Sequence, residues 1–231
     1  MDLRSPDSTT PVKKTRYHHG NLRISIIYSV AQLIGEERGI NFQLMDVAKL
    51  VGTSQPAIYK HFTNKSALLV ETAIEGYQLQ KQFRDSAFED TDGSPLARIF
   101  ALVQAYVNFS HTHSGFFLLM KTLETEEILS SKRYLSERVE SLSLANGLIG
   151  ECLDNGIFVD IDPQIAMTLL QSIAYGLAHL YITEQINLTA PTRQKEEKFQ
   201  EAVIVRGLDS LLSDKGKQAI SKISTVPNSQ Y

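Results

Sequence analysis

The sequence predicts an all-α protein in two parts, a small N-terminal three-helix unit followed by a larger helical domain. Apolar residues recur at spacings of three and four from Leu22 onward, as on the buried face of a helix. No run alternates apolar and polar residues between turn signals, as a strand would. The charge also divides the chain. Residues 1–70 hold 9 Lys or Arg against 5 Asp or Glu, whereas residues 71–231 hold 14 against 21.

This asymmetry favours a polyanionic partner for the first part and not for the second, with chance clustering as the alternative. The 231 residues can bury a sizeable core, and 42% hydrophobic with 21% charged residues argues against general disorder. The single cysteine, Cys152, cannot form an internal disulfide. No stretch reaches the roughly 18 apolar residues of a membrane span. The polar N-terminus lacks the apolar centre of a secretory signal, so we expect a cytoplasmic protein without a membrane partner.

The first helix is expected to begin at Leu22, where Ile26, Val30 and Ile34 continue a spacing of four. Asn21 is available as its N-cap and Gly39 as its C-terminal stop. Before it, residues 1–16 are rich in Ser, Thr, Pro and charge, and are typical of a flexible basic arm.

The next two helices are short. Leu44 to Val51 repeats the helical spacing for about two turns, and Gly52 ends it. Ser54 is a natural N-cap for the following helix. Pro56 then falls in the first turn, where its missing N–H has no intrahelical partner to lose. We expect Ile58 and Phe62 on the inward face, with the helix ending near Phe62.

A longer fourth helix is expected to start after Thr63 or Asn64 and to run to about residue 88, and residues 89–95 form a turn. Only helices are expected beyond it. Their ranges are 95–111, 114–123, 126–154, 163–186 and 191–213. The predicted organisation is therefore an arm at 1–16, a three-helix unit at 17–68, a helical domain at 69–214 and a flexible tail at 215–231.

A short helix ending in Gly52, a tight turn and a second short helix make a helix-turn-helix, whose second helix can enter the major groove of DNA. The alternative is an unrelated helical corner. The outward-facing residues of the second helix separate the two interpretations. Gln55 can pair with adenine, Pro56 and Ala57 suit the thymine methyl group, and Tyr59, Lys60 and His61 can donate to phosphates. This is the composition of a base-reading face.

Residues 20–69 resemble the DNA-binding domain of TetR/AcrR transcriptional repressors. The resemblance is carried by Gly39, Val47-Ala48, Gly52, Ser54 and the segment "AIYKHFTNKSALL" at 57–69. It implies that Gln55, Pro56 and Ala57 face bases and that Tyr59 and His61 contact phosphates. Lys65 would offer a phosphate its ammonium and the N–H groups of a helix start.

Three positions depart from the family pattern or match no fixed family residue. Lys60 is one of these, and it would touch either DNA or solvent. The family usually has Thr near the start of the second helix, where this chain has Gln43 and Leu44. Leu44 cannot donate to a phosphate, so Gln43 is the remaining candidate there.

The resemblance also implies that the second part binds an effector and forms a homodimer. Two long segments, 162–182 and 196–212, carry small residues that would allow close helix packing between subunits, although packing within one subunit is the alternative. These small residues are Ala174, Gly176, Ala178, Ala202 and Gly207. An effector pocket is expected among the central helices, where core packing is again the alternative. Its candidate lining residues are Phe109, Phe116, Phe117, Met120, Gln171, Tyr175 and His179.

The leading hypothesis is a dimeric repressor that binds a palindromic operator on double-stranded DNA and is released by a small molecule. The alternative is a DNA-bound structural or partner-recruiting protein on the same fold without a small effector. No nucleophile elbow, phosphate-binding loop or metal-ligand cluster is present in the sequence, so we expect no enzyme activity, no cofactor and no metal.

Overall fold

The computed structural model describes residues 21–186 and 193–224, and the arm expected at 1–16 lies outside them. Within the described ranges the secondary structure is helical, with one isolated bridge between Phe158 and Leu212 and no strand. The predicted all-α class is confirmed.

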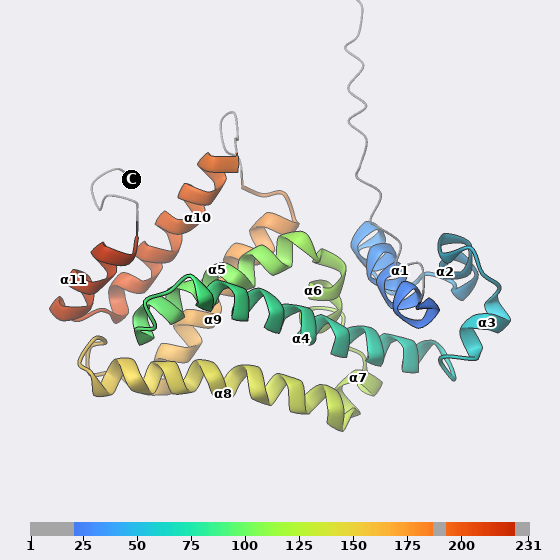
Figure 1. Ribbon diagram of the computed structural model, residues 1–231, viewed down its shortest axis with the longest axis horizontal. Coiled ribbons are helices and arrows are strands. Elements are labelled where there is room, and N and C mark those ends of the chain that lie inside the picture. The colour runs from blue at the N-terminus through green and yellow to red at the C-terminus, as the bar shows by residue number, and fades with distance from the viewer. Residues whose placement is uncertain (1–20, 187–192, 225–231) are drawn as a thin grey trace, which may run out of the picture.

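The N-terminal helices are α1 (Leu22–Glu37), α2 (Leu44–Val51) and α3 (Gln55–Tyr59), and they gather at one end of the molecule. The helix α4 (Lys65–Glu89) starts beside them and runs along the larger domain (Figure 1). The remaining elements are α5 (Pro95–Thr112), α6 (Ser114–Lys121), α7 (Glu126–Ser130), α8 (Lys132–Asp154), α9 (Pro163–Ile182), α10 (Arg193–Leu208), the short 3₁₀ helix η1 (Asp209–Leu211) and α11 (Asp214–Ile223).

Several helix ends follow the predicted capping residues. The side chain of Asn21 accepts a hydrogen bond from the Ile24 amide, and that of Asn64 accepts one from the Ala67 amide at 2.8 Å. Gly52 ends α2 in the left-handed conformation, with φ of 72°. These are the places where one side chain or one glycine decides the boundary, so sequence alone identifies them.

Three boundaries differ from the prediction. Arg38, not Gly39, takes the left-handed conformation that ends α1, with φ of 52°. The helix α3 ends at Tyr59, because the chain turns there to bring Phe62 into the core. The range 126–154 is two helices, since Ser131 is extended and caps α8 through the Tyr134 amide.

The prediction of a flexible tail is wrong for residues 215–223, because they belong to α11. Ile220 of this helix is buried in the core, and Gly216 lies against the Ile157 carbonyl oxygen, where a Cβ atom would stand 2.2 Å away. Polar composition concealed this contact, because only one face of a short helix is apolar.

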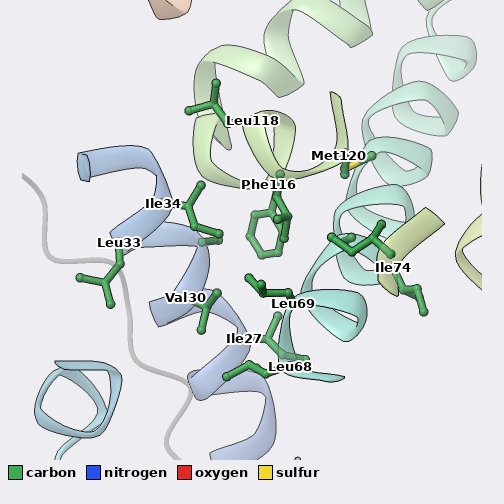
Figure 2. Close-up of a cluster of buried hydrophobic side chains, with 14 of the residues drawn as sticks. Ile27, Val30, Leu33, Ile34, Leu68, Leu69, Ile74, Phe116, Leu118 and Met120 are labelled. Atoms are coloured by element: carbon green, nitrogen blue, oxygen red, sulfur yellow. The ribbon is translucent and has the colours of Figure 1, made fainter. Parts of the chain in front are cut away.

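Two clusters of buried side chains hold the molecule together. The first joins α1, α2 and α3 to the N-terminal half of α4 and to α6. Figure 2 shows Ile27, Val30 and Ile34 of α1 meeting Leu68 and Leu69 of α4 and Phe116 of α6. The second cluster lies among α5, α8, α9, α10 and α11, and it includes the buried thiol of Cys152. The first core therefore continues through residue 68 into the larger domain.

Close backbone packing between α1 and α6 depends on Gly115. A Cβ atom on Gly115 would lie 1.7 Å from the carbonyl oxygen of Ala31, which real structures do not tolerate. Only glycine permits this approach. The contact fixes α1 on the larger domain.

Helix α9 is long and apolar enough to cross a membrane by composition, with a mean hydropathy of 1.4 over 18 residues. It packs on α5, α8 and α10, and buries Leu170, Ala174 and Ala178. This packing is that of a core helix, although Ile165 and Leu180 remain 53% and 39% exposed.

Candidate functional site

The outer face of α3 is exposed as the sequence predicts. Ile58 and Phe62 are 1% and 4% exposed and anchor the helix to the first core. Gln55, Pro56, Lys60 and His61 are exposed, Ala57 is half-buried and Tyr59 is 49% exposed. The side chains with hydrogen-bonding groups therefore point away from the domain, where a major groove could receive them.

Two polar residues flank this face. Ser54 occupies the N-cap position of α3, but its hydroxyl does not cap the helix. Gln43 is exposed and stands at the N-cap of α2. Its backbone N–H donates to the Asp46 carboxylate at 3.3 Å. Contacts of Ser54 and Gln43 with a DNA phosphate stay predictions.

Lys65 has a structural contact that the sequence did not indicate. Its ammonium donates to the carbonyl oxygens of Ile40 and Phe42, each at 2.6 Å, and lies 4.1 Å from the centre of the Phe42 ring. Desolvation lowers the pKa of Lys65, with a smaller opposing effect of Glu37. The ammonium therefore ties the loop between α1 and α2 to the start of α4. A phosphate role for Lys65 stays a prediction.

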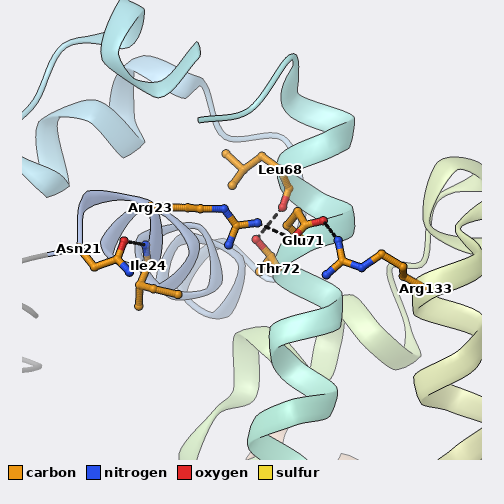
Figure 3. Close-up of polar contacts among 7 residues, drawn as sticks. All are labelled: Asn21, Arg23, Ile24, Leu68, Glu71, Thr72 and Arg133. Atoms are coloured by element: carbon orange, nitrogen blue, oxygen red, sulfur yellow. Dashed lines mark hydrogen bonds and ion pairs between the residues drawn. The ribbon is translucent and has the colours of Figure 1, made fainter. Parts of the chain in front are cut away.

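An ion cluster joins α1, α4 and α8. The guanidinium of Arg23 on α1 donates to one carboxylate oxygen of Glu71 on α4, and Arg133 on α8 donates to the other (Figure 3). Glu71 is 20% exposed, so its charge is partly shielded from water. The carboxylate bridges the N-terminal unit and the larger domain.

The larger domain contains a partly open cavity of about 400 Å³. Helices α4, α5, α6, α8 and α9 line it. The apolar wall comes mainly from α5, α8 and α9, and is formed by Ile99, Leu102, Val103, Leu142, Ala145, Met167, Leu170 and Ala174. Tyr106 and Tyr175 add aromatic rings. Cavities of this volume and composition commonly hold small organic ligands.

Polar groups gather at one region of the wall. Lys121 at the end of α6 donates to the Tyr77 hydroxyl at 3.0 Å, and its ammonium lies 4.7 Å from the Tyr77 ring centre. Burial lowers the pKa of Lys121 to about 8. Arg138 pairs with Glu124 at 3.2 Å, and the buried Tyr134 hydroxyl also donates to Glu124. A single cavity thus combines an apolar wall with a charged end.

The predicted pocket residues are only partly brought together here. Met120, Gln171 and Tyr175 line the cavity. Phe117 stacks on Tyr175 from behind, with ring centres 6.0 Å apart, and His179 stacks on the same tyrosine. The other two predicted residues, Phe109 and Phe116, are buried in the first core. Four residues of the predicted set are therefore not among those that line the cavity, namely Phe109, Phe116, Phe117 and His179.

Sequence reasoning missed Tyr77, Gln80, Tyr106, Lys121, Glu124 and Arg138, all of which line the cavity. One signal was present, since Lys121 directly ends the apolar run 115–120. A lysine held beside such a run is either a helix end in solvent or a buried charge, and the sequence does not separate the two. Within the described ranges, no group of three or more His, Cys, Asp or Glu residues could hold a metal ion.

A tight turn at Gly52 and an exposed second helix with a buried anchor define a helix-turn-helix of the kind that DNA-binding proteins use, with an all-helical domain behind it. Residues 30–72 match the family described as bacterial regulatory proteins, tetR family. The N-terminal unit is therefore similar to the DNA-binding domain of this family, as the resemblance of residues 20–69 predicted, and this match supports a DNA-binding regulator.

Several known proteins are similar to this chain over most of its length. The nucleoid occlusion factor SlmA of Shewanella sp. strain W3-18-1 is 24% identical over 186 residues, which cover 78% of this chain and 92% of SlmA. The TetR family regulator PfmR of Thermus thermophilus has the same fold, with a TM-score of 0.61, 19% identity, and coverage of 81% of this chain and 96% of PfmR. AibR, solved with isovaleryl coenzyme A and operator DNA, has a TM-score of 0.63 at 14% identity, covering 83% of this chain and 98% of AibR.

Proposed function

We propose that this regulator is a homodimeric repressor that binds a palindromic operator and is released when a small molecule enters the cavity of the larger domain. The observation that carries the proposal is the course of α4. This helix begins beside α3 and, farther along, contributes Tyr77 and Gln80 to the cavity wall. One rigid element thus touches both sites.

The length of α4 makes a small movement effective. From Lys65 to Tyr77 is twelve residues, or about 18 Å at the rise of an α-helix. A tilt of about 5° over that distance moves the helix start by roughly 1.5 Å. Two recognition helices that read successive major grooves must stand about 34 Å apart, so opposite shifts in two subunits would spoil the fit to DNA.

A second copy is proposed to pack on the exposed face of α9. Ile165, Thr168, Ser172, Gly176 and Leu180 follow one another at helical spacing along this face. All of these except the half-buried Gly176 are exposed, and a Cβ atom on Gly176 would meet nothing within 4 Å. The Thr168 and Ser172 hydroxyls donate to carbonyl oxygens of their own helix, which leaves a nearly smooth surface for another helix.

The small residues first considered for this interface mostly pack inside the chain. Ala174, Ala178 and Ala202 are buried, and Gly207 faces Ile173, where a Cβ atom would stand 2.8 Å from that side chain. Gly176 alone among them is open. The proposed interface therefore keeps Gly176 and adds Thr168 and Ser172 as the small residues on α9.

The second candidate is a DNA-bound structural or partner-recruiting protein, and the observation that favours it is the similarity to nucleoid occlusion factors. The cavity supports the ligand-released repressor instead. Its half-buried Lys121 is costly to the fold and would be unnecessary for a purely structural protein.

The test begins with selection of duplexes from a random pool by the full chain. We expect a palindrome, with binding by two protomers in sedimentation equilibrium and with affinity that falls steeply as salt rises. A screen of small molecules against the labelled operator then measures release. The second candidate would be favoured by two results together. The protein would select a palindrome from which no compound releases it, and a partner protein would bind the DNA-bound form.

A further inference from the structure

One charge in the cavity is left without a counter-ion. The ammonium of Lys121 has three N–H donors, and the structure gives it one acceptor, the Tyr77 hydroxyl at 3.0 Å. Across residues 21–186 and 193–224, no carboxylate lies within 4.0 Å of this ammonium. Burial lowers its pKa to about 8, so the group is still mostly charged at pH 7.

The neighbouring charges do not neutralise Lys121, because they already have partners. Glu124 accepts from the Arg138 guanidinium at 3.2 Å and from the Tyr134 hydroxyl. Arg138 in turn has its charge matched by Glu124. The polar end of the cavity therefore carries one net positive charge, located at Lys121, and a half-buried cation of this kind favours an anion beside it.

The rest of the wall limits what that anion can be. Residues of α5 and α9, such as Ile99, Val103 and Leu170, present an apolar surface opposite the charged end. The cavity volume of about 400 Å³ lies within the range of pockets that hold small organic ligands, so there is room for an apolar body beside the charged group. A dianionic phosphate would leave one charge unmatched, since Lys121 supplies the single free cation among the lining residues that the structure describes.

We propose that the cavity binds an amphipathic monocarboxylate, with its carboxylate on the Lys121 ammonium and the Tyr77 hydroxyl. Its apolar body lies against α5 and α9. This inference rests on the proposed function, because it takes the cavity as the effector site, and it names the class of effector.

The direct test is titration calorimetry of the full chain at pH 7 with octanoate, decanoate and 4-phenylbutyrate. The matched neutral probes are octan-1-ol, decan-1-ol and 4-phenylbutan-1-ol, which keep the apolar body and lose the charge. We expect at least one acid to bind tenfold or more tightly than its alcohol. Equal affinity for acid and alcohol, or no acid binding below 1 mM, overturns the proposal.

A variant assigns the preference to Lys121. Lys121→Met removes the charge and keeps the length of the side chain, and we expect it to lose the acid affinity tenfold or more with less than a threefold change for the alcohols. Lys132→Met, on the exposed start of α8, is the matched control and should bind as wild type does. Circular dichroism and retained alcohol binding establish that the Lys121 variant is folded. An undiminished acid preference in that variant would refute the assignment.

The pH dependence provides a second readout. Between pH 7 and pH 9 the charged fraction of Lys121 falls about tenfold, and acid affinity should fall by a similar factor while alcohol affinity stays constant. The other ionisable groups facing Lys121 are Tyr77 of α4, Tyr106 of α5, Glu124, and Arg138 of α8. Burial raises the pKa of Tyr77 to about 12 and that of Tyr106 further, so neither loses its proton in this range. Constant acid affinity across the range would contradict a contact between the acid and Lys121.

Failure of this inference is distinguishable from failure of the proposed function. Anisotropy of the labelled operator measures release separately from calorimetry. If an acid binds but the operator stays bound, the ligand class stands and the release mechanism fails. If the operator is bound as a palindrome and none of the acids binds, this inference fails and the DNA-binding function stands.

Discussion

Gly115 of α6 lies so close to Ala31 of α1 that a Cβ atom on the glycine would stand 1.7 Å from the alanine carbonyl oxygen. The two helices belong to different halves of the molecule, and this contact holds them together at the backbone. The close approach leads to the first prediction.

Gly115→Ala should destabilise the protein by about 2 to 4 kcal/mol, because backbone atoms cannot move aside as a flexible side chain can. Thermal and urea unfolding measure the loss. Gly147→Ala in α8 is the matched control, since a Cβ atom there would meet nothing within 4 Å, and it should be neutral or stabilising by up to about 1 kcal/mol. Equal effects of the two changes would show that the contact is looser than described.

Neighbouring residues on α3 should separate stability from DNA binding. Ile58→Ala removes a side chain that is 1% exposed and should cost about 2 to 4 kcal/mol of unfolding free energy. Tyr59→Ala removes one that is 49% exposed and should leave the unfolding free energy within about 0.5 kcal/mol while weakening operator binding. A stable Ile58 variant, or a Tyr59 variant with full DNA affinity, would contradict the orientation of α3.

Gln55 and Lys60 should differ in what they contribute to DNA binding. Gln55→Ala should cost about 1 to 3 kcal/mol and relax the preference at one base pair of each half-site, since an amide can read adenine. Lys60→Ala should weaken binding to all DNA sequences. It should also reduce the slope of log affinity against log salt concentration by about one per protomer. Repeating the duplex selection with each variant, and titrating at two salt concentrations, measures both effects.

Lys121→Met should stabilise the ligand-free protein at neutral pH. The pKa of Lys121 is lowered from its usual 10.5 to about 8 in the folded state, so the unfolded chain binds more protons between these values. Wild-type stability therefore includes a contribution that rises with pH from about 8 to 10.5, and below pH 8 the buried charge costs about 1 to 3 kcal/mol.

The measurement is urea unfolding of both proteins at pH 7 and pH 10. The variant should be more stable at pH 7, and the difference should shrink at pH 10, while groups common to both proteins cancel. A variant less stable than wild type at pH 7 would mean that the ammonium is well solvated.

The sequence predicted the DNA-binding unit closely because its determinants are local. Ser54, Pro56 and Ile58 lie within five residues, and the helix period alone assigns them to the start and the inner face of α3. The cavity is different, since Tyr77, Lys121 and Arg138 come from three helices that are far apart along the chain. Helical spacing shows which residues share a face, and it does not show which neighbouring helix covers that face. Phe109 and Phe116 were therefore placed in the pocket, although other helices bury them in the core.

The shared core of α1, α4 and α6 also bears on how such regulators can be recombined. A chimaera that joins this DNA-binding unit to another effector domain at residue 68 would separate Ile27, Val30 and Ile34 from the Phe116 side chain that covers them. It would also set the Ala31 carbonyl group against whatever residue replaces Gly115. A working chimaera must therefore keep the α1-facing surface of α6 together with the recognition helix. The segment that has to be transferred is larger than the helix-turn-helix itself.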